Sequence, residues 1–276
     1  MTIEHRKLCH VQSFKREFTV PIEPIINNAH ATMPGAAFTA SASGDSCVIL
    51  DFGNTLDMHT NHLAARAATL LNAAWRNGRL GFVTDIVPAM VTVGIHYRLD
   101  HPVFLGSTAS PFATLCQYLC ELLDTNTPHA DSAPRRIEIP VCYGDEYGPD
   151  LAEVASRCGV SAGELIDIHS GEWWDVLMLG FAPGHPHIGI LDPRLSPPRR
   201  ATPRTLVKRG SVGLANRQSV IYPADLPGGW SLIGRTPLAM FNPALPSPCL
   251  LQAADKVRFI PIDAATFKAM SEEQRA

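Results

Sequence analysis

Residues 179–237 read LGFAPGHPHIGILDPRLSPPRRATPRTLVKRGSVGLANRQSVIYPADLPGGWSLIGRTP. Glycine and proline recur every few residues, and short apolar runs lie between them at Ser211–Leu214, Ser219–Tyr222 and Trp230–Ile233. Alternation of turn residues with short apolar runs is typical of a compact sheet with tight loops. The stretch therefore predicts a mainly-β region and excludes helices of any length within it.

The loops of this stretch are rich in histidine and arginine. His185 and His187 flank Pro186, and an imidazole can donate to a carbonyl or take up a proton near neutral pH. We therefore take His185 as the candidate catalytic residue. A metal site with Asp192 is the alternative, but an HxH pair with one distant carboxylate lacks a third ligand at a diagnostic spacing. No metal site is predicted.

Three arginines, Arg199, Arg200 and Arg204, stand among prolines and form either an anion clamp or ordinary loop charges. The planar guanidinium fork suits carboxylate, phosphate and ureido oxygens. Gln218 and Tyr222 follow on a predicted strand, where they either bind an amide or satisfy the hairpin itself. The candidate substrate-binding residues are Arg199, Arg204, Gln218, Tyr222 and Arg235. We expect Arg204, His185 and Gln218 to face a common cleft.

Two other kinds of chemistry are not supported by the pattern. Gly229–Thr236 (GWSLIGRT) imitates a phosphate loop, but its centre reads as a strand and Pro237 follows, so no helix N-terminus is available for phosphate. The chain has no GxSxG elbow, and no cysteine of the main stretch has a paired histidine. Covalent acyl chemistry is therefore not predicted.

The upstream half alternates strands and helices. A hairpin is predicted over residues 37–52, followed by a helix that Thr55 or Asp57 caps and Gly78 ends. Strands at 82–87 and 91–97 precede a helix that begins at Ser110 with Pro111 in its first turn. This order indicates a small α+β domain.

The remaining segments complete the predicted organisation. The polar run TNTPHADSAP at 125–134 is interpreted as a linker. Beyond it, helices are predicted at 149–158 and 162–169, and further strands of a small closed barrel at 136–143, 173–181, 239–241, 249–252 and 256–261. The predicted divisions are an extension at 1–35, an α+β domain at 36–128, a mainly-β barrel domain at 135–263 and a tail at 264–276.

Composition limits the classes of function. The chain has 276 residues, 46% of them hydrophobic and 18% charged, with a net charge of −3, so it can bury a large core but offers no basic surface for nucleic acid. Its seven cysteines form no CxxC pair and are expected to be reduced thiols. No apolar run suggests a signal peptide or a membrane span, and a cytoplasmic protein is expected.

Several blocks of the sequence resemble one family. The strings GFAPGHPHIG, LDPRLSPPRRATPRT, GSVGLANRQSVIYP and PGGWSLIGRTP, together with Gly44–Gly53 and Ile139–Leu151, resemble the B-type subunit of 5-oxoprolinase, allophanate hydrolase subunit 1 and the sporulation kinase inhibitor KipI. This is the family of carboxyltransferase domains, subdomains C and D. The resemblance covers about residues 38–262 and implies a cyclophilin-like β-barrel after a small α+β domain.

The resemblance also implies partners and cofactors. Members of the family work with a carboxyltransferase-type partner (the C-type subunit of 5-oxoprolinase or allophanate hydrolase subunit 2) and in some cases with the A-type subunit of 5-oxoprolinase. The implied activity is ATP-dependent opening of the lactam 5-oxoproline to L-glutamate by a complex whose single subunit is inactive alone. The alternatives are a urea-metabolising carboxyltransferase, the only case that implies biotin, and an inhibitor of a sensor histidine kinase. This chain departs from the family at 216–220, where NRQSV replaces a glycine-rich GGQTG, and this leaves the substrate open.

Overall fold

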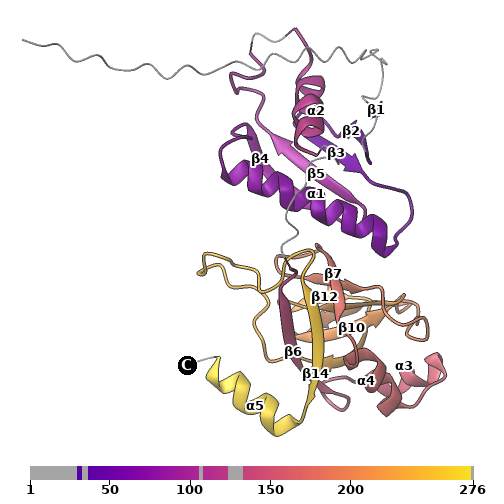
Figure 1. The fold of residues 1–276 in the computed structure, drawn as a ribbon. Coiled ribbons are helices and arrows are strands. Elements are labelled where there is room, and N and C mark those ends of the chain that lie inside the picture. Colours follow the sequence, from indigo (N-terminus) through magenta and orange to yellow (C-terminus); the bar gives the residue numbers. More distant parts are fainter. Residues whose placement is uncertain (1–29, 33–36, 106–107, 124–132, 275–276) are drawn as a thin grey trace, which may run out of the picture.

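The computed structural model describes residues 30–32, 37–105, 108–123 and 133–274 (Figure 1). Most of the predicted extension and of the predicted linker at 125–134 lies outside these ranges. Residues 30–123 are called the N-terminal unit below, and residues 133–274 the barrel unit. Figure 1 shows the two units one above the other, with α1 on the side of the N-terminal unit that faces the barrel.

The N-terminal unit is an antiparallel sheet covered by two helices. Its strands run in the order β1-β2-β3-β5-β4. The elements are β1 (His30–Thr32), β2 (Thr39–Ala42), β3 (Cys47–Asp51), α1 (Met58–Arg76), β4 (Val83–Pro88), β5 (Thr92–Tyr97) and α2 (Pro111–Leu122). The predicted hairpin and both helices are confirmed, whereas β1 lies inside the stretch that was predicted to be an extension.

The helix ends follow from side-chain chemistry. Asp57 caps α1 by accepting a hydrogen bond from the Thr60 amide at 2.8 Å, and Gly78 leaves the helix with φ +75°. Ser110 caps α2 in the same way through the Ala113 amide. Both helices place apolar side chains on the sheet, and Leu71 and Leu115 are fully buried against it.

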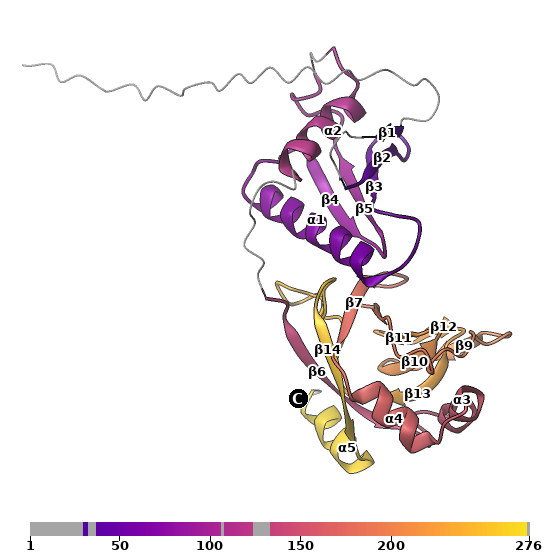
Figure 2. The same ribbon diagram turned by 45° about the vertical axis from the view of Figure 1, so that its right-hand side comes forward.

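The barrel unit is built on a closed seven-stranded barrel of order β10-β11-β8-β7-β14-β6-β13. Its first strand pairs in parallel with its last, and Figure 2 shows β6 and β14 side by side. The strands are β6 (Arg136–Tyr143), β7 (Trp174–Leu179), β8 (Pro186–Gly189), β10 (Ser211–Ala215), β11 (Gln218–Ile221), β13 (Ser231–Arg235) and β14 (Lys256–Ile262). A separate two-stranded sheet consists of β9 (Arg204–Val207) and β12 (Leu226–Gly228). The predicted α+β unit followed by a mainly-β barrel is confirmed.

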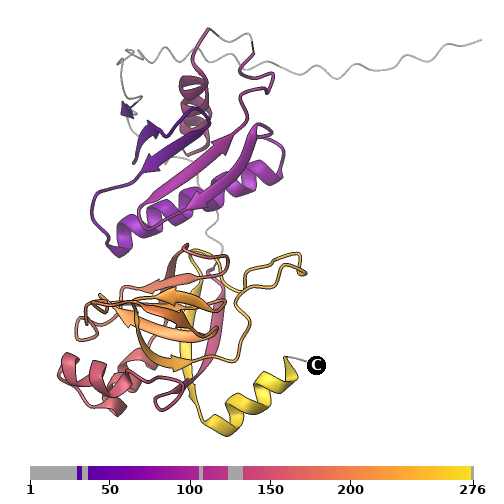
Figure 3. The same ribbon diagram turned by 180° about the vertical axis from the view of Figure 1, so that it is seen from behind.

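Three helices lie outside the barrel wall. They are α3 (Leu151–Cys158), α4 (Ala162–Ser170) and α5 (Ala264–Glu273). Seen from behind in Figure 3, α3 and α4 lie together beneath the barrel, and α5 leaves its lower end on the other side. The strands predicted at 239–241 and 249–252 are wrong: these segments contribute only one bridge, between Phe241 and Cys249, and otherwise form loop.

Polar contacts join the two units. The buried Asn61 on α1 donates to the carbonyl oxygens of Met90 and Leu177, at 2.7 and 3.1 Å, so one amide links the β4–β5 turn of one unit to β7 of the other. His62 and Lys256 both contact the carboxylate of Asp175. Among the described residues, no helix is long and apolar enough to cross a membrane.

Candidate functional site

The candidate site lies on the outer face of the barrel wall. Side chains alternate along each strand, and Ile188 of β8 and Ile221 of β11 belong to the barrel interior. Their neighbours His187, Val220 and Tyr222 therefore face outward. There, Val220 and Tyr222 pack with Trp230 and with Val207 of β9 in a second apolar cluster.

His185 is held by a tight turn just before β8. Its amide donates to Ala182 O at 3.0 Å, and its carbonyl accepts from Gly180 N at 3.1 Å. Gly184 has φ +76°, and a Cβ atom there would lie 2.8 Å from Met240 O, so only glycine fits. The His185 side chain is 1% exposed, and neither ring nitrogen has a hydrogen-bond partner among the described residues. An unpaired buried imidazole is costly and marks a candidate ligand-binding group.

Aromatic rings surround this imidazole. Phe181, His187 and Tyr222 lie 5.3, 5.2 and 5.2 Å from it between ring centroids, and His187 in turn lies 6.0 Å from Trp230. We call Phe181, His185, His187, Tyr222 and Trp230 the His185 cluster. Phe181 is 66% exposed and has φ +78°, which is uncommon for a residue with a side chain.

Burial keeps these groups neutral. It lowers the pKa of His185 to about 4, and the neighbouring His187 contributes to this shift. Burial also lowers the pKa of His187, while the Gln218 side chain opposes that shift. Burial raises the pKa of Tyr222, so its hydroxyl remains a donor. Near neutral pH the cluster therefore offers one donor and one acceptor on His185, the unpartnered Nδ1 of His187 and a phenol.

Arg199 brings a positive charge to the cluster. Its guanidinium carbon lies 4.9 Å from the Trp230 ring centroid, a cation–π geometry. It is close enough to oppose the raised pKa of Tyr222 and to lower the pKa of His187. No carboxylate among the described residues pairs with it. Arg199 is thus a cation that remains available to an anionic ligand.

The backbone of β12 lies against the hydroxyl end of the Tyr222 side chain. A Cβ atom on Gly228 would lie 2.0 Å from the Tyr222 hydroxyl oxygen, so the phenol occupies the space that a side chain on β12 would fill. The backbone amide of Trp230 also interacts with the phenol oxygen and opposes its raised pKa. The position of the hydroxyl is therefore set by Gly228 of β12 and by the Trp230 amide that follows it.

Arg204 and Arg235 have different surroundings. Arg204 donates to both carboxylate oxygens of Asp150, at 2.9 and 2.7 Å, so its fork is already engaged. Arg235 donates from Nε to Arg209 O and lies over Phe267 of α5 at 5.8 Å, in another pocket. The structure thus brings together His185, Arg199, Gln218 and Tyr222 and leaves Arg204 and Arg235 out of the group.

Three residues of this region were not singled out from the sequence. Phe181 and Trp230 line the cluster, and Asp150 holds Arg204. Trp230 packs on the bare backbone of Gly213, where a Cβ atom would lie 2.7 Å from Trp230 Cβ. Asp150 carries no local signal, because its partner lies 54 residues away.

A second buried histidine belongs to the barrel interior. His169 contacts Tyr143 Oη through Nδ1 at 2.7 Å and Ser219 Oγ through Nε2 at 3.0 Å, and Ser219 donates to Gly213 O. Because the single Ser219 proton is used there, Nε2 of His169 must be the protonated nitrogen. Burial lowers the pKa of His169 to about 3. This neutral chain of hydrogen bonds fixes β11 from the inside.

No group of three metal-ligating side chains occurs within the described ranges. Asp192, the carboxylate considered for a metal with His185 and His187, instead accepts two hydrogen bonds from the Arg194 side chain.

Comparison with known proteins places this chain in a family. The model of the carboxyltransferase domain, subdomain C and D, matches residues 38–251. The chain belongs to this family. The B-type subunit of 5-oxoprolinase from Bacillus subtilis (strain 168) is 38% identical over 83% of this chain and 95% of its own length. The B-type subunit of 5-oxoprolinase from Escherichia coli O157:H7 is 51% identical over a shorter match. That match covers 46% of this chain and 58% of the relative.

Solved structures agree with this membership. TTHA0988 is 32% identical with a TM-score of 0.65 over 79% of this chain, and this match spans 40% of that longer chain. The urea amidolyase of K. lactis superposes with a TM-score of 0.64 over 92% of this chain and 17% of its own, at 19% identity, and so supports the fold alone. The carboxyltransferase-type architecture is therefore shared across the family.

Proposed function

We propose that this chain is the B-type subunit of a complex that couples ATP hydrolysis to the opening of 5-oxoproline to L-glutamate. The observation that carries the proposal is the similarity to a relative named as the B-type subunit of 5-oxoprolinase, over 95% of that relative's length. The chemistry of the His185 cluster fits a small amide that also carries a negative charge. 5-Oxoproline combines a planar lactam with one carboxylate.

The proposed roles follow from the geometry. Arg199 pairs with the substrate carboxylate, because its guanidinium has no carboxylate partner among the described residues. Gln218 offers a donor and an acceptor to the lactam. His185, neutral at working pH, accepts a proton from the attacking water through its basic ring nitrogen as the new C–O bond forms. It then passes a proton to the lactam nitrogen as the C–N bond breaks, and the Tyr222 hydroxyl donates to the carbonyl oxygen.

ATP supplies the driving force when the complex is loaded. The one segment that imitates a phosphate loop, residues 229–236, contains strand β13, so no helix N-terminus follows it to receive phosphate. This segment therefore does not bind the phosphates of ATP as a phosphate loop does. The proposal includes a carboxyltransferase-type partner, the C-type subunit of 5-oxoprolinase, together with the A-type subunit, because the relatives are named as subunits and TTHA0988 extends well beyond the matched region.

The test is reconstitution. The purified chain, alone and with its partner subunits, is supplied with ATP and 5-oxoproline, and glutamate release is measured. We expect release only from the complex, without biotin, and a loss of about 100-fold for His185→Asn, the scale of general acid–base catalysis. His59→Asn, an exposed histidine on α1, is the matched control.

Three results would contradict the proposal. Glutamate release by the chain alone would show that it carries the whole reaction. Biotin-dependent carboxylation of urea by the complex, without glutamate, would favour the urea-metabolising alternative. Inhibition of a sensor kinase by a chain that supports neither reaction would favour the regulator.

A further inference from the structure

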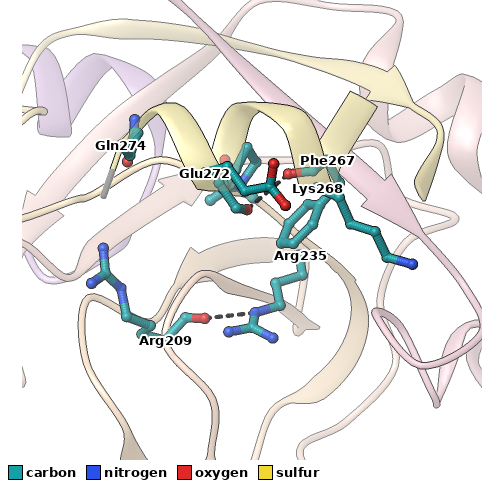
Figure 4. Close-up of a pocket in the computed structure, with 9 residues that line it drawn as sticks. Arg209, Arg235, Phe267, Lys268, Glu272 and Gln274 are labelled. Atoms are coloured by element: carbon teal, nitrogen blue, oxygen red, sulfur yellow. Dashed lines mark hydrogen bonds between the residues drawn. The ribbon is translucent and has the colours of Figure 1, made fainter. Parts of the chain in front are cut away.

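A pocket lies between α5 and the barrel, away from the His185 cluster. Its volume is about 290 Å³. Arg209 and Arg235 line it from the barrel, and Phe267, Lys268 and Glu272 line it from α5 (Figure 4). Three cations and one carboxylate thus line one pocket on a chain whose net charge is −3.

No carboxylate among the described residues engages the two arginines, as is also the case for Arg199 in the His185 cluster. Elsewhere in the barrel unit, Arg135, Arg204 and Arg258 each pair with an Asp or Glu. Among the described residues, Arg235 has only the bond from Nε to Arg209 O, at 2.8 Å, and the contact with the Phe267 ring. Its two terminal nitrogens remain available, although the residue is partly buried. Partial burial of an unpaired cation is unfavourable and is offset when an anion binds.

The backbone under these arginines is rigid. Arg209 N donates to Asp225 Oδ1 at 2.8 Å, Gly210 N donates to Tyr222 O at 2.7 Å, and Thr236 N donates to Gly210 O at 2.9 Å. A Cβ atom on Gly210 would lie 2.3 Å from Thr236 O, so the turn meets the end of β13 closely. The guanidinium of Arg235 is therefore already oriented, which lowers the entropic cost of binding.

We propose that this pocket is a binding site for a small oxyanion, a carboxylate or a phosphate, held by the fork of Arg235 with Arg209 beside it. Glu272 has no ion-pair partner among the described residues and faces the same pocket, so it weakens the binding of any anion (Figure 4). The site is separate from the proposed 5-oxoproline site and does not depend on that function.

Titration calorimetry on the full chain tests the proposal, with potassium phosphate and L-glutamate as separate probes and sodium chloride at matched ionic strength as the reference. We expect saturable binding of at least one probe, and the stronger of the two identifies the class of anion. Arg235→Gln should weaken binding at least tenfold, and Glu272→Gln should strengthen it. Arg157→Gln, which removes a positive charge on α3, should change it less than twofold.

Thermal unfolding of each variant checks that it folds. If Arg235→Gln does not fold, the exposed Glu272→Gln variant decides the matter, because a loss of repulsion must raise the affinity. Binding no stronger than that of chloride, wild-type affinity in Arg235→Gln, or unchanged affinity in Glu272→Gln would each overturn the proposal.

Discussion

Arg204 donates to both carboxylate oxygens of Asp150, a residue that is only 5% exposed. The same carboxylate accepts from Leu232 N at 2.7 Å and pairs with Arg200 at 3.4 Å. Asp150 thereby ties the proline-rich loop and β9 to strand β13. A buried carboxylate with three partners is costly to disturb, because removing one partner leaves charge without compensation.

We expect Arg204→Lys to lower the free energy of unfolding by about 1–3 kcal/mol, because lysine cannot form the bidentate pair. Urea denaturation measures the change, and Arg157→Lys on exposed α3 is the control. In a double-mutant cycle with Asp150→Asn, the two effects should not add. Unchanged stability combined with a large loss of complex activity would instead assign Arg204 to the substrate.

Arg199→Gln should raise the KM of the complex for 5-oxoproline at least tenfold and leave the unfolding midpoint nearly unchanged. The reason is that Arg199 is exposed and lies over Trp230 without a carboxylate partner among the described residues. Steady-state kinetics on the reconstituted complex measure this, with Arg194→Gln as a control arginine bound to Asp192. Equal KM values for the wild type and Arg199→Gln would remove Arg199 from the proposed site.

The buried histidines predict acid sensitivity. The pKa of His185 is about 4 and that of His169 about 3, both below the ordinary value of 6.5. At a pH between the unfolded pKa of 6.5 and the folded pKa of each histidine, the unfolded chain binds more protons than the folded chain. The stability contributed by the neutral histidines is therefore fully present above about pH 6.5 and is lost as the pH falls toward 4 for His185 and 3 for His169. Urea unfolding at about pH 7, 6 and 5 should show this decline. His185→Gln should flatten it, and an identical slope in that variant would contradict the assignment.

A substitution of Phe181 should weaken substrate binding without lowering the stability of the fold. Its backbone is in the left-handed region, and its ring is exposed beside His185. Phe181→Gly should keep or increase stability, by up to about 1 kcal/mol, because glycine adopts this φ readily. The KM of the complex should nevertheless rise, since the aromatic wall beside His185 is lost. Leu245→Ala, another exposed apolar residue, is the control, and an unchanged KM in Phe181→Gly would exclude a binding role for this ring.

The sequence predicted correctly those helices whose first residues are set by a nearby capping side chain. Asp57, Ser110 and Ser161 each cap a helix that the sequence predicts, because a cap involves only residues up to three positions away. The segments 239–241 and 249–252 were predicted as strands from their apolar residues. A strand also requires a partner along its length, and here only Phe241 and Cys249 meet.

The sequence predicted which types of residue form the site, but not which of these residues lie together in the structure. Tyr222 and His187 share a face because strands alternate, and the register pairs His187 with Val220. Arg204 and Arg235 stand in the same Gly/Pro-rich stretch, and nothing local distinguishes them from Arg199. Their partners, Asp150 and Phe267, lie outside that stretch, and only the closed barrel brings them together.

The parallel pairing of β6 with β14 determines when this barrel can form. Arg136 is opposite Lys256, and Glu138 is opposite Arg258, 120 residues further along the chain. Until Lys256–Ile262 has been synthesised, β6 and β7 both expose an unpaired edge. Closure of such a long loop is slow, and open edges favour aggregation during that interval. A chain that ends before residue 256 therefore keeps both edges open, and its barrel cannot close.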